Sequence, residues 1–559
     1  MRSIRIHSLL FVLVILGCSD PVPAPMRAAH SADQEPRYGG TLRYASFAAL
    51  RSLDPALGGD GLSAPFMRLL FAGLIDYDEA GQLAPDLARS WDVLEEGSVY
   101  RFALREGVRM HDGNEFDASD IKRSVERALH PKTPNPLASY YSLLEGYDDF
   151  ATGKAEEIRG IRILGKYLVE FRLTEPDSRF LPLVAITTLR PTCRSAGSTY
   201  DERWHPCGAG PFRLPPDGFL PGIRARAVRH DSYFVPGLPY LDAIEILFNV
   251  PPLTQRIKFA RGDLDYTHDL SSADTVRYVR DSAWTPFSHT TSDVQIQGES
   301  MNTEMPPFDN VEVRRAVACA IDREALVKLK PRHMSVLTGA IPFHVPGYSP
   351  EFEGQRFDLP QALEHMKRAG YPYDPKTGQG GYPVTIPYLV YPQGLLKEAG
   401  QVVQQQLARI GIRTELRLVS WASYLALTQR RNTTALSPQA WQQDYPDASS
   451  FFEPLFGSAA INDTESSNSA FYKNPALDSL LIKARREFDP NRRREIYREA
   501  NRIVRDDAPW AFEYSVHYFE LTQPYVRGYK PHPIWNYHFA RVWRDRDTTS
   551  RTPIHRGDR

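Results

Sequence analysis

A short segment in the C-terminal half of the chain places two carboxylates among aromatic side chains. It reads WQQDYPDASSFF, residues 441–452, and contains Asp444 and Asp447. A carboxylate beside aromatic rings is costly to remove from water unless a cation or hydrogen-bond donors meet it. Tyr445 precedes Pro446 and is therefore pushed towards an extended conformation, which makes Asp444 a loop residue. The segment is thus solvated, paired within the protein, or a place where a ligand binds.

A second candidate for chemistry is the pair His111 and Asp112 in the sequence MHDG. A catalytic triad would also need a serine in a nucleophile elbow, which does not accompany this pair. Asp112 and the following glycine are typical of a tight turn, so we expect the histidine to satisfy local groups. The sequence GAGPF, residues 208–212, is too short for a phosphate-binding loop and predicts a turn that enters a strand. No CxxC or His/Cys cluster has zinc-site spacing, and no cofactor is expected.

The N-terminus has the pattern of an export signal. Two arginines precede an apolar run, residues 9–16, that is too short and wrongly flanked for a membrane span. The sequence ILGC, residues 15–18, resembles a bacterial lipobox, in which Cys18 is lipidated and anchors the protein to a membrane. The alternative is ordinary signal cleavage with Cys18 incidental. We therefore predict a signal peptide over residues 1–17 and, over 18–36, a lipidated cysteine with a flexible tether.

The composition is that of a large globular protein. The chain has 559 residues, of which 42% are hydrophobic and 24% charged, so it can bury a substantial core. The formal net charge is -1 and basic residues are spread among acids, so nothing indicates nucleic-acid binding. Export implies an oxidising compartment, in which Cys193 and Cys207 could close a short polar loop as a disulfide. Cys319 would remain as a buried thiol in an apolar helical pattern.

Strand and helix patterns alternate along the chain. Residues 98–129 predict a strand, a turn and then an amphipathic helix whose N-cap is Asp117. Residues 311–329 predict one long helix with an apolar side. Residues 396–421 predict a helix, a stop at Gly411 and a following strand, which is the pattern of an α/β unit. The fold class is therefore α/β throughout.

Six stretches of the chain form a recognisable set. They read GLIDYDEAGQLAPDLARSWDV, YRFALREGVRMHDGNEFDASDI, CGAGPFRL, MNTEMPPFDNVEVRRAVACAIDREAL, WQQDYPDASSFF and VRGYKPHPIWNYHFARVW. Their order and spacing resemble the family 5 solute-binding proteins, which are the peptide- and nickel-type receptors of bacterial ABC importers. The resemblance extends from about Tyr38 to Trp543. It rests on the whole set, since no single motif is specific.

The resemblance implies a large fold of the type II periplasmic-binding-protein kind, with two α/β lobes, a hinge and an extra inserted domain. Lobe I would be discontinuous and comprise residues 37–66, 205–290 and 515–546. The inserted domain would comprise residues 67–204, and lobe II would comprise residues 291–514. A solute would bind between the two lobes.

The resemblance also implies which residues meet the solute. In peptide-binding members an aspartate in a Trp-x-x-Asp motif holds the ligand's ammonium group, and Asp444 matches it. Trp421 matches a tryptophan that helps to wall the cleft, and Trp441, Tyr445 and Tyr391 complete the predicted ligand site. The alternative is that Asp444 caps a local turn and the aromatic residues belong to the core. The segment around Tyr391 contains no arginine, so a longer peptide or another cationic solute suits the site better than a dipeptide.

The function that the resemblance implies is that of a non-enzymatic, monomeric receptor. It would be periplasmic or extracytoplasmic and membrane-anchored, and would deliver a peptide or peptide-like solute to the permease of an ABC importer. One alternative is a receptor for nickel or another metal chelate, with contacts from His111, His268 or His517. A less favoured alternative is a secreted hydrolase, which would require a nucleophile or a metal site.

Overall fold

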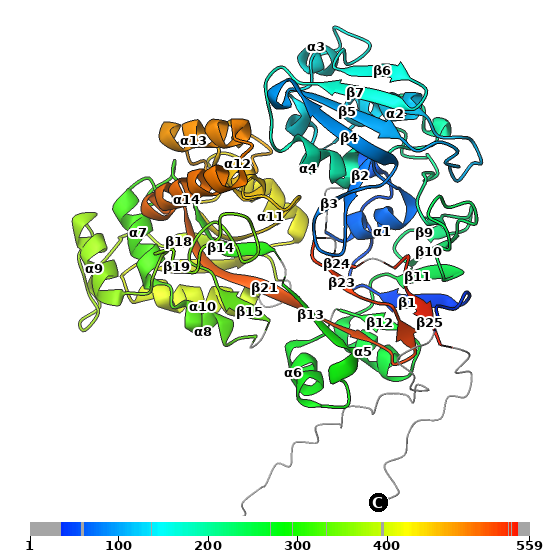
Figure 1. Cartoon of the computed structure of the whole chain (residues 1–559). Helices are drawn as coiled ribbons and strands as arrows, with labels where there is room; N and C mark the ends of the chain where they lie inside the picture. The colour runs from blue at the N-terminus through cyan, green and yellow to red at the C-terminus, as the bar shows by residue number, and fades with distance from the viewer. Residues whose placement is uncertain are drawn as a thin grey trace, which may run out of the picture.

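The computed structural model describes residues 35–545, except for 58–60, 136, 269, 293, 331–332, 393–395, 535 and 538. The predicted signal peptide and Cys18 lie outside the described residues. Among the described helices, none combines the length and the apolar character that crossing a membrane requires. Figure 1 shows lobe II beside the other two parts, with the inserted domain standing above lobe I.

Lobe I is built on a five-stranded mixed sheet. Its strands are, in order, β1 (Thr41–Ala45), β11 (Ala243–Leu247), β10 (Arg224–Arg229) and β8 (Phe212–Arg213), with β9 (Phe219–Leu220) beside β10. Strands β1 and β11 are parallel, and the remaining pairs are antiparallel. Alternation along these strands buries Leu42, Tyr44, Ile244 and Ile246 in one core, against which helix α1 (Ser63–Leu70) packs.

The inserted domain contains a four-stranded antiparallel sheet. The strand order is β4 (Ala88–Leu94), β5 (Val99–Leu104), β7 (Leu168–Arg172) and β6 (Ile161–Gly165). Helix α2 (Ala118–Leu129) buries Ile121 and Val125 in the same core as residues of this sheet. Its N-terminus is closed by a capping box, in which Asp117 and Asp120 each accept a backbone N–H. The predicted N-cap Asp117 is therefore confirmed.

Lobe II carries the largest sheet of the described residues. Within this eight-stranded sheet, four neighbouring strands follow in the order β14 (Gln295–Met301), β20 (Leu436–Gln442), β18 (Ile386–Val390) and β19 (Thr414–Leu418). Strand β18 is parallel to both β20 and β19, whereas β14 is antiparallel to β20. Met301 and Leu436 belong to one core cluster, and Ile296 and Trp441 contact another. Both faces of the sheet are therefore covered, as is usual where strands run parallel.

Two extended segments connect lobe I with lobe II. Strand β21 (Trp510–Thr522) pairs with β14 and β15 (Met334–Val336) in lobe II and with β12 (Tyr266–Thr267) and β13 (Ser288–Ser292) in lobe I. The second crossing runs from β13 into β14. Because these strands join two separate cores, they stand where a hinge between two lobes is expected. The predicted boundaries at 290/291 and 514/515 fall within β13 and β21, and the boundaries of all parts stay a prediction.

The remaining elements surround these sheets. The helices are α3 (Tyr147–Ala151), α4 (Phe180–Ala185), α5 (Pro252–Ala260), α6 (Ser272–Arg280), α7 (Val311–Ala320), α8 (Arg323–Val327), α9 (Leu359–Arg368), α10 (Leu396–Ala408), α11 (Trp421–Thr428), α12 (Ser449–Phe456), α13 (Pro475–Arg486) and α14 (Pro490–Asp507). Short strand pairs are β2 (Ile75–Tyr77) with β3 (Leu83–Pro85), β16 (Tyr373–Asp374) with β17 (Gln379–Gly380), β22 (Val526–Arg527) with β25 (Trp543–Arg544), and β23 (Pro531–His532) with β24 (Asn536–Tyr537). The 3-10 turns are η1 (Pro55–Leu57), η2 (Glu95–Gly97), η3 (Ala138–Tyr141), η4 (Thr187–Leu189), η5 (Arg194–Ala196), η6 (Thr285–Phe287) and η7 (Ser458–Ala460).

One element prediction is confirmed and another is wrong. The helix, stop and strand predicted over residues 396–421 are present as α10 and β19, with Gly411 at a positive φ of 78° between them. The single helix predicted over 311–329 is instead broken into α7 and α8. Ile321 is extended at the break, and the Asp322 side chain accepts the Ala325 N–H as the N-cap of the second helix.

Candidate functional site

Three chain segments emerge side by side at one edge of the lobe II sheet. The parallel strands β20, β18 and β19 are neighbours in this order, so their carboxyl ends meet at the same edge. Asp444 follows β20, Tyr391 follows β18 and Trp421 follows β19. The carboxyl edge of parallel strands is where open α/β sheets bind ligands. The topology therefore brings three of the five predicted ligand residues to one edge.

Asp444 carries a carboxylate that the protein solvates incompletely. Its Oδ2 accepts a hydrogen bond of 2.8 Å from the Tyr140 hydroxyl, and its backbone N–H donates to Ser450 Oγ at 2.8 Å. No arginine or lysine of the described residues lies within 4 Å of this carboxylate. Burial raises the pKa of Asp444 to about 7, although the Tyr140 hydrogen bond acts in the opposite direction. A cation arriving at this carboxylate would relieve the cost of its burial.

Asp447, three residues further on, is paired within lobe II. Its Oδ1 accepts hydrogen bonds from Arg493 at 2.9 Å, from the Ser449 N–H at 2.9 Å and from the Tyr497 hydroxyl at 3.2 Å. The side chain is buried, and so is most of Arg493. The two carboxylates of the segment therefore differ in role. Asp447 fixes the fold around α12 and α14, whereas Asp444 lacks a charged partner among the described residues.

Tyr140 is a site residue that the sequence analysis missed. It belongs to η3 of the inserted domain, and its ring meets the Tyr445 ring edge to face at a centroid distance of 6.2 Å. It lies 304 positions from Asp444 in the chain. The only local signal is a tyrosine in a turn, which is too common to indicate a site. Its role becomes visible only once the inserted domain is docked on lobe II.

Trp441 and Tyr445 flank Asp444 but lie largely inside the protein. Trp441 pairs with Ile296 in the sheet and packs partly against a core cluster of lobe II. Tyr445 is 1% exposed, packs with the core of the inserted domain, and its hydroxyl lies 3.0 Å from Ser449 Oγ. Their direct contact with a solute stays a prediction.

An aromatic cluster stands further along the same sheet edge. The ring centroids of Tyr391 and Trp421 are 4.5 Å apart, and those of Tyr391 and Tyr424 are 4.7 Å apart. Trp421 is stacked on Tyr424 and remains 51% exposed, while Tyr424 is buried. Burial raises the pKa of Tyr391 to about 12, so its hydroxyl remains a hydrogen-bond donor at neutral pH. The cluster offers an exposed apolar surface with a polar hydroxyl, which suits a peptide-like solute.

Lobe I reaches this edge of lobe II through the loop before α1. A Cβ atom at Gly61 would lie 2.6 Å from Oε1 of Gln442, the last residue of β20. The loop is held at its other end by Asp54, which receives a two-pronged ion pair of 3.0 and 2.6 Å from Arg127 of α2. Arg127 is buried and also donates to the Ala196 carbonyl at 3.1 Å. The lobes thus meet beside Asp444, and Asp54 of lobe I is held by the inserted domain.

A buried pair of acids lies within the lobe II sheet. Glu299 of β14 and Glu513 of β21 are both buried and close enough for the charge of one to raise the pKa of the other, and the Tyr388 hydroxyl donates to Glu299. Burial and then the charge of Glu513 raise the pKa of Glu299 well above its usual range. Burial raises the pKa of Glu513 to about 7, although the charge of Arg323 opposes this. Because two like charges cannot both be held there, the pair retains a proton at neutral pH.

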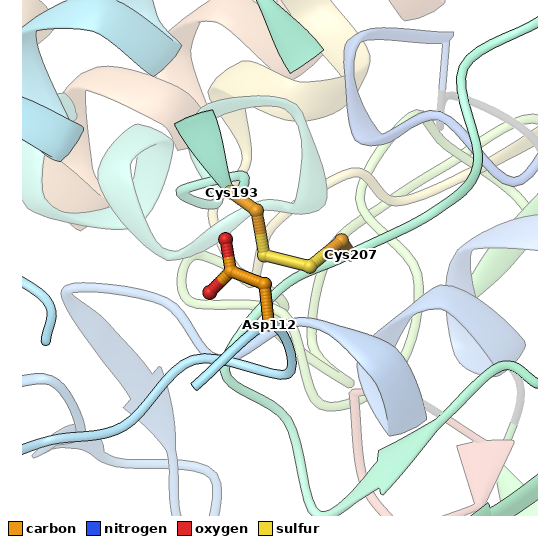
Figure 2. Close-up of side chains that lie close together, drawn as sticks. All are labelled: Asp112, Cys193 and Cys207. Atoms are coloured by element: carbon orange, nitrogen blue, oxygen red, sulfur yellow. A yellow bond between two sulfur atoms is a disulfide. The ribbon is translucent and has the colours of Figure 1, made fainter. Parts of the chain in front are cut away.

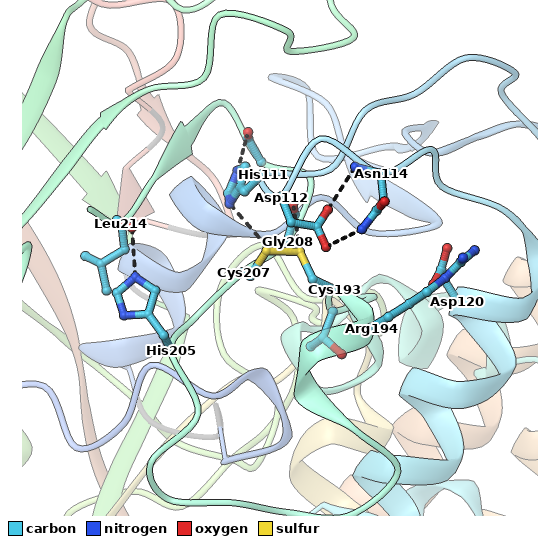
Figure 3. The surroundings of a disulfide bond; sticks show 12 residues. His111, Asp112, Asn114, Asp120, Cys193, Arg194, His205, Cys207, Gly208 and Leu214 are labelled. Atoms are coloured by element: carbon cyan, nitrogen blue, oxygen red, sulfur yellow. Dashed lines mark hydrogen bonds and ion pairs between the residues drawn. A yellow bond between two sulfur atoms is a disulfide. The ribbon is translucent and has the colours of Figure 1, made fainter. Parts of the chain in front are cut away.

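Cys193 and Cys207 are joined in a disulfide, with their Cα atoms 5.4 Å apart. Figure 2 shows the Asp112 side chain beside this bond, and the three side chains are the one group of three or more potential metal ligands within the described residues. A metal would require thiolates, whereas both sulfurs are bonded to each other. Figure 3 shows that Asp112 is instead held by Asn114, at 3.0 and 2.9 Å.

His111 is occupied by local backbone groups. Its Nδ1 accepts the Gly208 N–H at 3.2 Å, and its Nε2 lies 3.1 Å from the Gly210 carbonyl (Figure 3). Burial lowers the pKa of His111 to about 3, so the ring is neutral and Nε2 carries the proton. The turn expected at MHDG and the turn expected at GAGPF therefore pack against each other. No group of described metal-ligand side chains unites His111 with His268 or His517.

Comparison with known proteins shows which family the sequence matches. The sequence profile described as bacterial extracellular solute-binding proteins, family 5 Middle, matches residues 82–463. The glutathione-binding protein GsiB of Salmonella paratyphi A is 26% identical over 466 residues, which cover 82% of this chain and 86% of that protein. GsiB of Escherichia coli O157:H7 matches with the same identity and coverage.

Solved structures share the fold. The periplasmic binding protein DppA from Helicobacter pylori, in complex with the peptide STSA, has 25% identity and a TM-score of 0.77, and the match covers 91% of this chain and 99% of that one. The oligopeptide-binding protein AppA from Bacillus subtilis, in complex with a nonapeptide, has 20% identity, a TM-score of 0.77 and coverage of 92% and 100%. These likenesses confirm the predicted type II periplasmic-binding-protein fold of mixed α/β content.

Proposed function

Because the chain belongs to the bacterial extracellular solute-binding proteins of family 5, we propose that it captures peptide-like solutes that carry a free amino group. The solute binds between lobe I and lobe II, and Asp444 receives its ammonium group. The protein then presents the solute to the permease of an ABC importer. Solute-binding receptors of this family are periplasmic or extracytoplasmic and are not enzymes, and we extend both properties to this chain.

This proposal rests mainly on the surroundings of the Asp444 carboxylate. Its carboxylate lies at the ligand-binding edge of the sheet, has its pKa raised to about 7 by burial, and has no cationic partner among the described residues. A primary ammonium can donate up to three hydrogen bonds, and its charge would match the carboxylate. Oδ1 of Asp444 has no hydrogen-bond partner among the described residues and is the oxygen that would accept from it.

The relatives support the same class of solute. GsiB is named as a glutathione-binding protein, and DppA is described in complex with the peptide STSA. Glutathione and a tetrapeptide share an ammonium group, amide bonds and a carboxylate. The exposed face of Trp421 and the hydroxyl of Tyr391 offer apolar contact and one hydrogen bond along the extended solute. No arginine occurs in the described part of residues 386–396, so the proposal does not include a carboxylate contact there.

Closure of the two lobes follows from how the solute would be held. The hinge of β13, β14 and β21 lets the lobes move, and Gly61 of lobe I lies against Gln442 beside Asp444. A solute that touches both lobes favours the closed state by the contacts that it makes only there. We further propose that the mature protein is a monomer anchored through a lipid on Cys18.

Calorimetric titration tests the proposal. The ligands are glutathione and tri-alanine, each with a free amino group and with an N-acetylated one. We expect a free-amino form to bind and acetylation to weaken binding by about a hundredfold, because the carboxylate would be left buried without its partner. Equal affinity for the free and acetylated forms would overturn the role of Asp444. Binding of neither class would overturn the solute class itself.

A further inference from the structure

A second contact region between the inserted domain and lobe II is centred on Arg179. This side chain is 4% exposed and donates to Asp177 of its own domain at 2.8 and 2.6 Å. It also forms an ion pair with Glu453 of α12 in lobe II. Glu453 in turn accepts from Arg485 at 2.9 and 3.0 Å. The four side chains make a balanced chain of alternating charge across the boundary between the two parts.

The backbone on either side of Arg179 adds to this contact. Ser178 donates its N–H to the Arg485 carbonyl at 2.8 Å and its hydroxyl to the Ala484 carbonyl at 3.3 Å. These carbonyls belong to the last turn of α13, where a helix has no internal donors left, so the inserted domain caps a lobe II helix. Nearby, a Cβ atom at Gly97 would lie 2.0 Å from the Phe488 ring, so a side chain there would displace this ring.

Arg179 and Tyr140 are tied together within the inserted domain. Arg179 is the N-cap of α4, and its carbonyl accepts the Leu183 N–H at 2.9 Å. The Leu183 carbonyl in turn accepts the hydroxyl of Tyr141, the neighbour of Tyr140, at 2.9 Å. On the lobe II side, Glu453 belongs to the helix that follows the Asp444 loop. The ion pair and the Tyr140–Asp444 hydrogen bond therefore join the same two pieces of structure.

We propose that Arg179 is a positioning residue for the Asp444 site. By bridging Asp177 and Glu453 it docks the inserted domain on lobe II and holds the Tyr140 hydroxyl against the Asp444 carboxylate. The inference rests on the proposed function, because it takes Asp444 as the group that receives the ammonium of the solute. It makes the inserted domain part of the solute site, although Arg179 itself does not contact the solute.

The same interface offers a matched control. Arg486 of α13 pairs with Glu175 of the inserted domain, but both side chains are much more exposed than Arg179 and Glu453, at 57% and 31%. Exposed pairs contribute little, whereas removing one member of a buried pair leaves its partner uncompensated. Glu175→Gln should therefore leave the docking intact. Glu453→Gln should weaken it, because Arg179 and Arg485 both lose a partner.

The experiment is a double-mutant cycle on the affinity for tri-alanine, measured by titration between pH 5.5 and 8.5. We expect Tyr140→Phe and Glu453→Gln each to weaken binding by about tenfold, and the double variant to be no weaker than the worse single variant. In both single variants the pH at which binding is half lost should move upwards, because Asp444 loses the hydrogen bond that lowers its pKa. Glu175→Gln should match the wild type in affinity and in pH profile. Additive effects, or a pH profile unmoved by Glu453→Gln, would overturn the proposal.

Hydrogen exchange on the solute-free protein separates this inference from the proposed function. Glu453→Gln should speed backbone exchange in both residues 138–141 and 444–450, whereas Glu175→Gln should not. If tri-alanine fails to bind the wild type but this coupled exchange is seen, the solute class is wrong and the positioning role stands. If exchange changes only around α12, the positioning role is wrong. Should Glu453→Gln fail to fold, Arg179→Lys makes the same test, because lysine lacks the fork that reaches both acids.

Discussion

The Tyr140 hydroxyl donates a 2.8 Å hydrogen bond to the Asp444 carboxylate across the boundary between the inserted domain and lobe II. A phenol can stabilise a carboxylate, but it cannot neutralise it. Asp447, in contrast, has the Arg493 guanidinium at 2.9 Å. The two aspartates, three residues apart, thus differ in their surroundings, and under the proposed function the solute supplies the cationic partner of Asp444.

Replacing each aspartate by asparagine should therefore have different consequences. Asp447→Asn should lower the free energy of unfolding by about 3 kcal/mol, because Arg493 is left buried without its counter-charge. Asp444→Asn should leave stability at pH 8 unchanged or slightly higher, because it removes a carboxylate that burial disfavours. Denaturant titration of both variants checks this. Equal destabilisation by the two substitutions would contradict the division of roles.

Solute binding should release protons below neutral pH. The pKa of Asp444 is raised to about 7 in the solute-free protein, and an ammonium beside it would lower that pKa again. Affinity for an amino-bearing solute should accordingly be highest above pH 7 and fall by up to about tenfold for each pH unit below it. Titration calorimetry at pH 6 in two buffers of different ionisation enthalpy measures the protons released. Proton uptake, or affinity that stays constant between pH 5 and 8, would argue against Asp444 as the ammonium site.

The local parts of this site could be predicted from the sequence, and the long-range parts could not. The loop position of Asp444 and the N-cap Asp117 depend on neighbouring residues, which a sequence displays directly. The break between α7 and α8 was missed because the apolar pattern continues across it. Asp322 favours the start of a new helix, and this competes with continuation of the first helix. The contact of Tyr140 with Asp444 depends on how two separately folded parts dock, and no local pattern encodes it.

The pairing of Glu299 with Glu513 was hidden for a similar reason. The register between β14 and β21 shifts at Gln297 and Gly298, which leaves Glu513 as an extra residue in β21. Such bulges redirect a side chain out of the regular alternation, so strand periodicity could not place both acids on one face. Only the register of the assembled sheet brings them together.

Stability should depend on the proton that this acid pair holds. The pKa of Glu513 is raised to about 7 from the 4.5 of an unperturbed glutamate, so its contribution to stability is fully present below pH 4.5 and is lost as pH rises through about 7. Glu513→Gln places an amide that stays neutral at every pH beside Glu299. Between pH 5 and pH 8 the free energy of unfolding of the wild type should fall. In the variant this fall should be smaller by about 2 kcal/mol.

Denaturant titrations of wild type and Glu513→Gln at both pH values measure this difference. The exposed Glu415 provides the matched control, and Glu415→Gln should show no such change. An identical pH dependence in the wild type and in Glu513→Gln would show that Glu513 does not lose its proton between pH 5 and pH 8.

The disulfide should stabilise the protein by limiting the freedom of its unfolded chain. Cys193 and Cys207 are 14 positions apart, and closing a loop of about this length contributes about 3 kcal/mol. The double variant Cys193→Ser/Cys207→Ser should lose about that much, and Cys319→Ser, which removes the free half-buried thiol, should not. Denaturant titrations with and without a reducing agent measure both effects. A wild type that is equally stable in reducing and oxidising conditions would contradict the prediction.

Native mass spectrometry of the gently purified wild type and Asp444→Asn proteins tests most directly whether Asp444 holds the amino group of a peptide-like solute. The account predicts that the wild type carries peptide-like solutes with a free amino group and that Asp444→Asn carries far less of them. Solutes that lack any free amino group, or the same solutes retained in the same amounts by Asp444→Asn, would contradict it.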